Sequence, residues 1–203
     1  MNQINQIKIN PNLDITTVAG VDEVGRGALA GPVVTTAIIL TKNCPINELK
    51  DSKLLSKQKR TVLYHKLIKT TPYIRTAIIN HHIIDNINIL NATLKGMLYC
   101  IKKLTIKPDT IYIDGDKIPK DKNYNMQAII KGDLLIPAIS AASIVAKVTR
   151  DIIMDKYDKK YPLYNFKQHK GYGTADHIEK VLNYGKSNIH RQSFTVKKQL
   201  SLF

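Results

Sequence analysis

The chain has 203 residues and a mass of 22.9 kDa, which suffices for one domain with a sizeable core and excludes a short peptide. Hydrophobic residues make up 43% of the chain and charged residues 23%, a balance typical of a globular protein rather than a disordered or fibrous one. Basic residues outnumber acidic ones by 31 to 16, and the formal net charge of +15 favours a polyanionic partner such as nucleic acid.

Five strands and four helical segments define the expected fold. Short runs of β-branched and apolar residues predict strands at 17–21, 33–40, 73–79, 110–113 and 126–130. Apolar residues at helical spacing predict a helix that begins at Ser56 and is bounded by Pro72, and another over 87–104. Pro137 opens a long helix, because proline is favoured at the first helical position and the next twenty residues lack Gly and Pro. With one more helix beyond Thr174, the pattern predicts an α/β fold with a mixed sheet.

The two cysteines, Cys44 and Cys100, lie far apart in the sequence and belong to no C-x-x-C or His-Cys motif. Neither a zinc site nor a disulfide framework is indicated, and a reducing compartment fits best. The first residues (MNQINQIKINPNLD) form no apolar targeting segment, and no stretch reaches the ~18 apolar residues of a membrane span. We expect a cytoplasmic protein without membrane contact.

Carboxylates follow three of the predicted strands, as Asp22-Glu23, Asp114 and Asp133. An ionised carboxylate at the end of a buried strand costs several kcal/mol unless a cation or hydrogen bonds compensate it. Together the four acids could hold one or two Mg²⁺ or Mn²⁺ ions, which prefer oxygen ligands. Alternatively, each Asp opens a turn. Since neighbours in a regular strand face opposite ways, Asp22 and Glu23 can share a site only at a strand end or bulge, which Gly25 would allow.

A loop rich in glycine follows the first pair of acids. Gly25-Arg26-Gly27, with Gly31-Pro32 close behind, leaves backbone groups bare beside a guanidinium, which suits a phosphate or a ribose. Such a loop is also a common turn.

The long helix carries three polar residues at i, i+4 and i+7 spacing, namely Ser143, Lys147 and Arg150. This spacing places them on one face, where they could contact backbone phosphates. A solvated charged face is the alternative. Lys53 of the DSK segment is a further candidate for phosphate contact.

Eight segments resemble, in order and in spacing, those of bacterial ribonuclease HII: VAGVDEVGRGALAGPVV, DSKLLS, NILNATLKGM, YIDGD, IIKGD, ISAASIVAKVTRD, HKGYGT and HRQSF. The similarity extends from about Val18 to Val196. It implies a ribonuclease H-like fold, in which helices flank a five-stranded mixed sheet and a C-terminal helical extension grips the duplex. A single domain over 1–203 is expected, with a catalytic core of about 17–196 and a tail of 197–203.

The resemblance also implies roles for individual residues. The metal-binding and catalytic carboxylates of the family fall on Asp22, Glu23, Asp114 and Asp133. The loop that reads the 2′-hydroxyl of a ribonucleotide at its junction with DNA falls on Gly25, Arg26 and Gly27, and the tyrosine that stacks on the neighbouring deoxyribose falls on Tyr172. A flat ring accepts a sugar that lacks the 2′-hydroxyl, although a packing role for Tyr172 is the alternative. His169, His190 and Arg191 lie in matching motifs with open roles.

The implied activity is that of an endoribonuclease. It would hydrolyse the RNA strand of RNA/DNA hybrids and nick 5′ of ribonucleotides in duplex DNA by two-metal-ion hydrolysis, giving 3′-hydroxyl and 5′-phosphate ends. Ribonuclease HIII is a related alternative, but it usually carries an extra N-terminal domain, and only 17 residues precede the first motif here. A non-catalytic module that binds hybrids or a clamp is the alternative from another class. A monomer is expected.

The last five residues form a second recognisable peptide, Gln199-Leu200-Ser201-Leu202-Phe203. It resembles the pentapeptide with which many bacterial replication and repair proteins dock into the DNA sliding clamp. Leu202 and Phe203 would be the buried anchors and Gln199 would supply hydrogen bonds. Packing of the tail against its own domain is the alternative.

Overall fold

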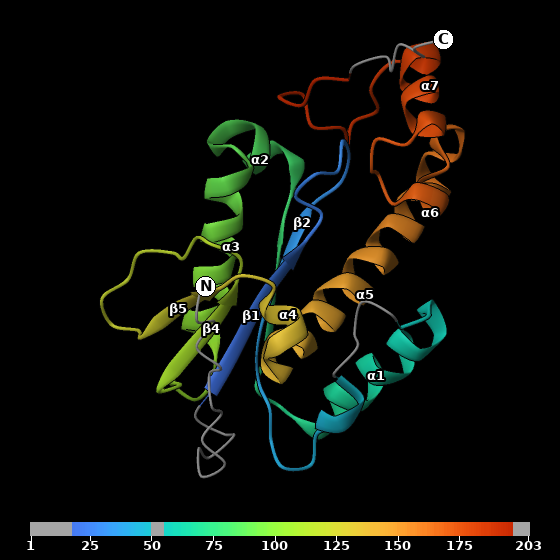
Figure 1. The fold of residues 1–203 in the computed structure, drawn as a ribbon. Helices are drawn as coiled ribbons and strands as arrows, with labels where there is room; N and C mark the ends of the chain where they lie inside the picture. Colours follow the sequence, from blue (N-terminus) through green and yellow to red (C-terminus); the bar gives the residue numbers. More distant parts are fainter. Residues whose placement is uncertain (1–17, 50–54, 197–203) are drawn as a thin grey trace, which may run out of the picture.

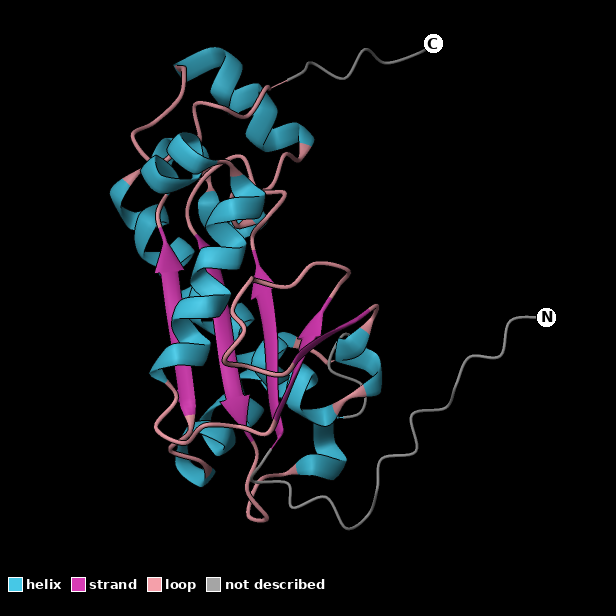
Figure 2. Cartoon of the chain, turned by 90° about the vertical axis from the view of Figure 1, so that its left-hand side faces the viewer, coloured by secondary structure: helices cyan, strands magenta, loops and turns pink. Residues whose placement is uncertain are grey.

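A five-stranded mixed sheet forms the centre of the protein in a computed structural model that describes residues 18–49 and 55–196 (Figures 1 and 2). The strand order is β3-β2-β1-β4-β5. The strands span Val18–Val24 (β1), Val33–Ile39 (β2), Ile74–Ile79 (β3), Thr110–Asp114 (β4) and Met126–Ile129 (β5). The predicted α/β class and mixed sheet are therefore confirmed.

Strand β2 runs in the direction opposite to the other four strands of this sheet. β1 pairs antiparallel with β2 across the short connection 25–32. β2 pairs antiparallel with β3, after a longer connection over 40–73. β1 pairs parallel with β4, and β4 pairs parallel with β5. The carboxyl ends of β1, β4 and β5 consequently meet at one edge, which is where open α/β sheets place ligands.

Helices cover both faces of the sheet. The described helices span Lys57–Thr70 (α1), His81–Ile87 (α2), Ile89–Lys103 (α3), Gly132–Leu135 (α4), Pro137–Lys160 (α5), Phe166–His169 (α6) and Ala175–Tyr184 (α7), with 3-10 turns at Ile46–Leu49 and Pro162–Tyr164. One core cluster joins α1 and α5 to β2, and the other joins α3 to β1, β2 and β4. Figure 1 shows α3 on one side of the sheet and α5 on the other.

The long helix α5 approaches β1 so closely that only glycine fits at position 20. A Cβ added to Gly20 would lie 2.1 Å from the backbone carbon of Ala138, a distance at which the two backbones would have to separate. Pro137 occupies the first turn of α5, as predicted. This contact fixes α5 across the strand that carries Asp22 and Glu23.

The expected helix over 87–104 is α3, which spans Ile89–Lys103, and a further short helix, α2, precedes it over His81–Ile87. Asn88 lies between them with φ of +64°, and its side chain accepts a hydrogen bond from the Asn91 amide to cap α3. Asn80 caps α2 in the same way through the Ile83 amide. The sequence analysis predicted no helix over 81–87, so α2 is an element that apolar periodicity did not reveal.

The C-terminal section adds a small core of its own. Met154 of α5, Phe166 of α6 and Val181 of α7 pack with Ala30 and Ile189. Figure 1 shows the loop between β1 and β2 beside the C-terminal segment, although about 160 residues separate them in the chain. Within the described ranges, no helix has the length and apolar character needed to cross a bilayer.

Candidate active site

Two of the candidate carboxylates are neighbours across parallel strands. Val21 of β1 pairs with Ile113 of β4, and Asp22 and Asp114 are the next residue of each strand. Asp22 is buried, with 5% of its surface exposed. The parallel register thus brings these two acids to the same edge of the sheet.

The fourth acid reaches this edge through a short helix. The Oδ1 atom of Asp114 accepts hydrogen bonds from the backbone amides of Gly132 at 2.7 Å and of Asp133 at 3.4 Å. These amides open α4, so Asp114 caps the helix that carries Asp133. Asp133 is itself only 2% exposed. The structure therefore brings Asp22, Glu23, Asp114 and Asp133 to one region.

The first strand was predicted to end at residue 21, before Asp22, and this prediction was wrong for the pairing with β2. β1 continues to Val24, and its pairing with β2 stays regular, with Asp22 opposite Thr36 and Glu23 opposite Thr35. The parallel pairing with β4 does end at Val21. Asp22 and Glu23 therefore follow the last pair between β1 and β4, without a bulge. Asp114 interacts electrostatically with both.

Burial and repulsion by neighbouring carboxylates raise the pKa of two of these acids, Asp22 and Glu23. Burial raises the pKa of Asp22 well above its ordinary value, and the charges of Glu23 and Asp114 raise it further, while the Ser143 side chain opposes the shift. Burial also raises the pKa of Glu23, and Arg26, 3.3 Å away, opposes that shift. A cation at this site would relieve both the burial cost and the repulsion.

Carboxylate oxygens are the ligands that Mg²⁺ and Mn²⁺ prefer, so this donor set fits a divalent ion. In the described part of the chain, no group of three His, Cys, Asp or Glu side chains is arranged as a ready metal site. Like charges disfavour close approach of carboxylates without an ion, so side-chain rotation would have to bring these groups together around one. Asp22, Glu23, Asp114 and Asp133 are the residues that would hold it.

Residues 25–32, here called the glycine loop, begin two residues after Glu23. Gly25 has a φ of +95°, and a Cβ at this position would lie 2.2 Å from Nε of Arg150, so both conformation and packing require glycine. Arg26 and Gly27 are exposed. At Gly27 the backbone is outside the left-handed region, and a Cβ would meet no described atom within 4 Å.

Tyr172 lies beside the glycine loop. It forms an isolated antiparallel bridge with Ala28, and the Gly171 carbonyl accepts a hydrogen bond from the Leu29 amide at 2.8 Å. The Arg150 guanidinium lies 5.3 Å from the centre of the Tyr172 ring. The structure thus brings together the two segments that the sequence analysis assigned to substrate binding.

The expected phosphate contact by Arg150 is wrong. Arg150 is fully buried, and its guanidinium donates to the carbonyls of Pro32 (2.9 Å), Ala30 (3.1 Å) and Lys170 (2.9 Å). Periodicity placed Arg150 on a polar face of the helix, but the glycine loop and the Lys170 turn cover that face. Arg150 holds these two segments together instead.

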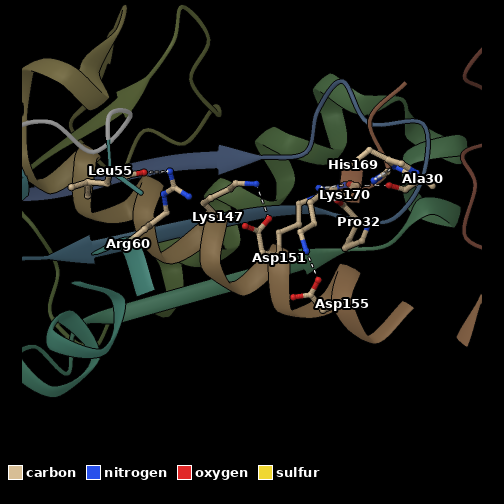
Figure 3. A network of polar contacts seen from close by, with 11 residues as sticks. Ala30, Pro32, Leu55, Arg60, Lys147, Asp151, Asp155, His169 and Lys170 are labelled. Carbon is tan, nitrogen blue, oxygen red and sulfur yellow. Dashed lines mark hydrogen bonds and ion pairs between the residues drawn. The ribbon is translucent and has the colours of Figure 1, made fainter. Parts of the chain in front are cut away.

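The other two members of the predicted helix face remain near the site. Ser143 is half-buried and affects the pKa of Asp22. Lys147 donates to Oδ1 of Asp151 at 2.6 Å, and its side chain keeps 30% exposure (Figure 3). Asp155, one turn further along α5, forms an ion pair with Lys170, which follows α6. Lys147 could contact a phosphate only if its ammonium group left the ion pair with Asp151.

Arg191 is one of the three residues, with His169 and His190, whose roles the sequence left open. It is fully buried and donates hydrogen bonds to three carbonyls of the glycine loop. The composition could have drawn attention to Arg191, because only five of the 31 basic residues are arginines. An arginine in a lysine-rich chain indicates a need for several directed donors.

Lys53 and the tail residues Gln199–Phe203 lie outside the described residues.

Comparison with known sequences gives matches to ribonuclease HII. The sequence profile described as Ribonuclease HII matches residues 19–197. A Ribonuclease HII of Coxiella burnetii is 50% identical over 186 residues, covering 92% of each chain. A Ribonuclease HII of Bacillus licheniformis is 45% identical over 181 residues, which are 89% of this chain and 70% of that one.

Solved structures share the fold. The crystal structure of ribonuclease H2 from Pyrococcus horikoshii matches with a TM-score of 0.72 and 29% identity, over 88% of this chain and 94% of that one. The structure of the PCNA:RNase HII complex from Archaeoglobus fulgidus gives 0.76 at 22% identity, over 91% and 98%. Bst-RNase HIII in complex with Mn²⁺ gives 0.69 at 17%, over 90% and 68%. The chain therefore belongs to the ribonuclease HII family, whose members are ribonuclease H hydrolases.

Proposed function

We propose that this ribonuclease H hydrolyses the RNA strand of RNA/DNA hybrids and nicks duplex DNA on the 5′ side of single embedded ribonucleotides. It would act through one or two Mg²⁺ or Mn²⁺ ions and leave 3′-hydroxyl and 5′-phosphate ends. Its cellular roles would be ribonucleotide excision and the removal of RNA primers. The protein would act as a monomer.

The observation that carries this proposal is the juxtaposition of buried Asp22 with Glu23 and Asp114, whose charges raise its pKa. A protein gains nothing in stability from such a group. Perturbed carboxylates at the carboxyl edge of a sheet are typical of functional sites. Divalent ions held there would stabilise the charge that develops on the phosphodiester oxygens. The solved Bst-RNase HIII complex with Mn²⁺ supports this choice of ion.

Substrate recognition is assigned to the glycine loop and Tyr172. The packing of the folded chain does not require glycine at position 27. The missing side chain instead leaves room for a ligand to approach the backbone there. The 2′-hydroxyl is the group that distinguishes RNA from DNA. Arg26 and Gly27 would read this hydroxyl, and the Tyr172 ring, supported by Arg150, would pack on the next sugar.

A second proposed interaction is docking to a DNA sliding clamp. The peptide Gln199-Leu200-Ser201-Leu202-Phe203 would supply the anchors, and the PCNA:RNase HII complex from Archaeoglobus fulgidus supports such an association. Deletion of residues 199–203 is expected to abolish capture by the clamp in a pull-down and to leave cleavage intact. Undiminished capture would refute this part of the proposal.

The enzymatic proposal is tested with three duplexes of the same sequence: one with a single embedded ribonucleotide, one uniform RNA/DNA hybrid and one of DNA only. We expect a nick 5′ of the ribonucleotide in Mg²⁺ or Mn²⁺, cleavage of the hybrid, and none of either in EDTA. Cleavage of the hybrid alone would refute the junction role of the glycine loop. Binding without cleavage of any duplex would favour the non-catalytic module.

A further inference from the structure

Arg191 binds the glycine loop from the side opposite to solvent. Its Nη2 donates to the Gly25 carbonyl at 2.6 Å, its Nη1 to the Arg26 carbonyl at 2.7 Å and its Nε to the Gly31 carbonyl at 3.1 Å. Its own amide donates to the Leu29 carbonyl at 2.9 Å. One buried side chain therefore holds both ends of the loop.

These hydrogen bonds determine the direction in which the N–H groups of the same peptides point. In a trans peptide, the carbonyl of one residue and the N–H of the next lie on opposite sides. Because the carbonyls of Gly25 and Arg26 point inward to Arg191, the N–H groups of Arg26 and Gly27 point away from it. Both residues are exposed, so two successive donors face outward, an arrangement that binds an oxygen ligand.

We infer that Arg191 is a positioning residue, which holds the Gly25 and Arg26 peptides so that the amides of Arg26 and Gly27 face the ribonucleotide at the cleavage junction. This inference rests on the proposed function of the loop. Arg191 has no exposed surface and so cannot touch the substrate itself. It acts only through the backbone that it binds.

Arginine suits this task better than lysine. The guanidinium carries its donors in a planar fork and can bond several carbonyls at fixed angles, whereas one ammonium is a compact point charge. Every side-chain hydrogen bond recorded for Arg191 ends on a carbonyl oxygen. Burial and the nearby charge of Arg150 lower its pKa to about 9, so it remains a cation at neutral pH and strengthens the positive potential behind the loop.

Other contacts hold the segment that carries Arg191 in place. Asp85 of α2 accepts hydrogen bonds from the amides of Gln192 and Ser193, both at 2.9 Å. Lys186 donates to the Arg191 carbonyl at 3.0 Å, and the Phe194 ring lies 4.9 Å from the guanidinium. The geometry of the loop thus depends on a chain of contacts that begins at a half-buried residue, Asp85.

The test compares Arg191→Lys with Val181→Ala, a matched control that weakens the same C-terminal core without removing a bond to the loop. We expect Arg191→Lys to increase amide hydrogen exchange in residues 24–28. We also expect it to lower kcat/KM on the single-ribonucleotide duplex at least about tenfold, mainly through KM, since small misplacements have effects of this size. Val181→Ala should leave loop exchange unchanged and kcat/KM within about twofold of wild type.

Unchanged loop exchange or unchanged kcat/KM in Arg191→Lys would overturn the inference. If this variant does not fold, Asp85→Ala takes its place and should raise exchange in residues 24–28 and KM to a smaller degree; no change in either would equally overturn it. Failure of the wild-type protein to nick the duplex would instead refute the proposed function. The exchange measurement would then still decide whether Arg191 orders the loop.

Discussion

His177 and His190 share a hydrogen bond between their Nε2 atoms, which lie 3.0 Å apart in the buried C-terminal section. The Nδ1 of His177 donates to the Tyr172 carbonyl at 2.9 Å, so Nε2 of the neutral ring must accept. His190 is therefore the donor, and its Nδ1 accepts from the amide and the hydroxyl of Ser187. This arrangement requires both rings to be neutral, and it ties the backbone of Tyr172 to the C-terminal segment.

Acid should therefore weaken the C-terminal section. Burial lowers the pKa of His190 to about 4, below the value of about 6.5 in an unfolded chain. Its contribution to stability is complete above pH 6.5 and is lost as the pH falls toward 4. We expect the unfolding free energy of wild type to fall, relative to His190→Gln, by on the order of 2 kcal/mol between pH 7 and pH 4.5.

His190→Gln is the matched variant because it keeps a side-chain N–H donor but does not titrate. The difference between the two proteins isolates His190 from Asp22 and Glu23, whose raised pKa values have the opposite effect on stability. Urea unfolding at a series of pH values measures this difference. A difference that does not change with pH would show that His190 is not buried in its neutral form.

Neutralising Asp22 should stabilise the metal-free protein. The raised pKa of Asp22 means that ionisation costs more in the folded state than in the unfolded one, and this cost appears as the pH rises. Asp22→Asn removes the charge, and Oδ1 still accepts from the Glu23 amide. We expect a higher Tm in EDTA at pH 8, since about 1 kcal/mol corresponds to about 2–4 °C in a chain of this size.

The same variant should lose cleavage activity, so that stability and function change in opposite directions. Asp116→Asn is the control, because it removes a carboxylate that is 68% exposed and should leave Tm unchanged. Mg²⁺ should raise the Tm of wild type more than that of Asp22→Asn, as expected for a ligand of the folded state. A lower Tm for Asp22→Asn in EDTA would contradict the account of this site.

Two glycines of the glycine loop should respond differently to the same substitution. Gly25→Ala places a methyl group against Arg150 and forces alanine into a left-handed conformation, so we expect a loss of about 1–3 kcal/mol of stability together with activity. Gly27→Ala meets no described atom within 4 Å. It should keep the wild-type Tm but lower kcat/KM on the single-ribonucleotide duplex.

Thermal unfolding and steady-state cleavage of both variants make this comparison. The Gly27 result carries the information about the substrate, because a fully stable but impaired enzyme indicates a steric conflict outside the folded chain. Full activity of Gly27→Ala would show that the substrate does not approach this backbone. Wild-type stability of Gly25→Ala would contradict the packing of Arg150 against the loop.

Residues with local signals were predictable from the sequence. Strands such as β2 and β4 and the start of α5 at Pro137 follow from β-branched runs and from proline preference. The acids Asp114 and Asp133 were recognised because each follows an apolar strand. The helix α2 was missed because its seven residues are fewer than the roughly 11 over which helical periodicity can be recognised.

The two buried arginines could not be assigned in this way. Arg150 and Arg191 bond carbonyls that lie 118 to 166 positions away in the chain, with the exception of Lys170. Periodicity describes a helix face but not what covers it. Only the folded structure shows that the glycine loop covers Arg150, which therefore does not reach the solvent.

The central claim is that Asp114 and its neighbouring acids form the divalent-metal site of a nuclease. The most direct measurement compares Asp114→Asn with Asp116→Asn, two residues apart, in cleavage of the single-ribonucleotide duplex over a range of Mg²⁺ concentrations. We predict that Asp114→Asn lowers kcat at least about 100-fold at saturating Mg²⁺, whereas Asp116→Asn remains within about twofold of wild type. Near-normal cleavage by Asp114→Asn at saturating Mg²⁺ would contradict the claim.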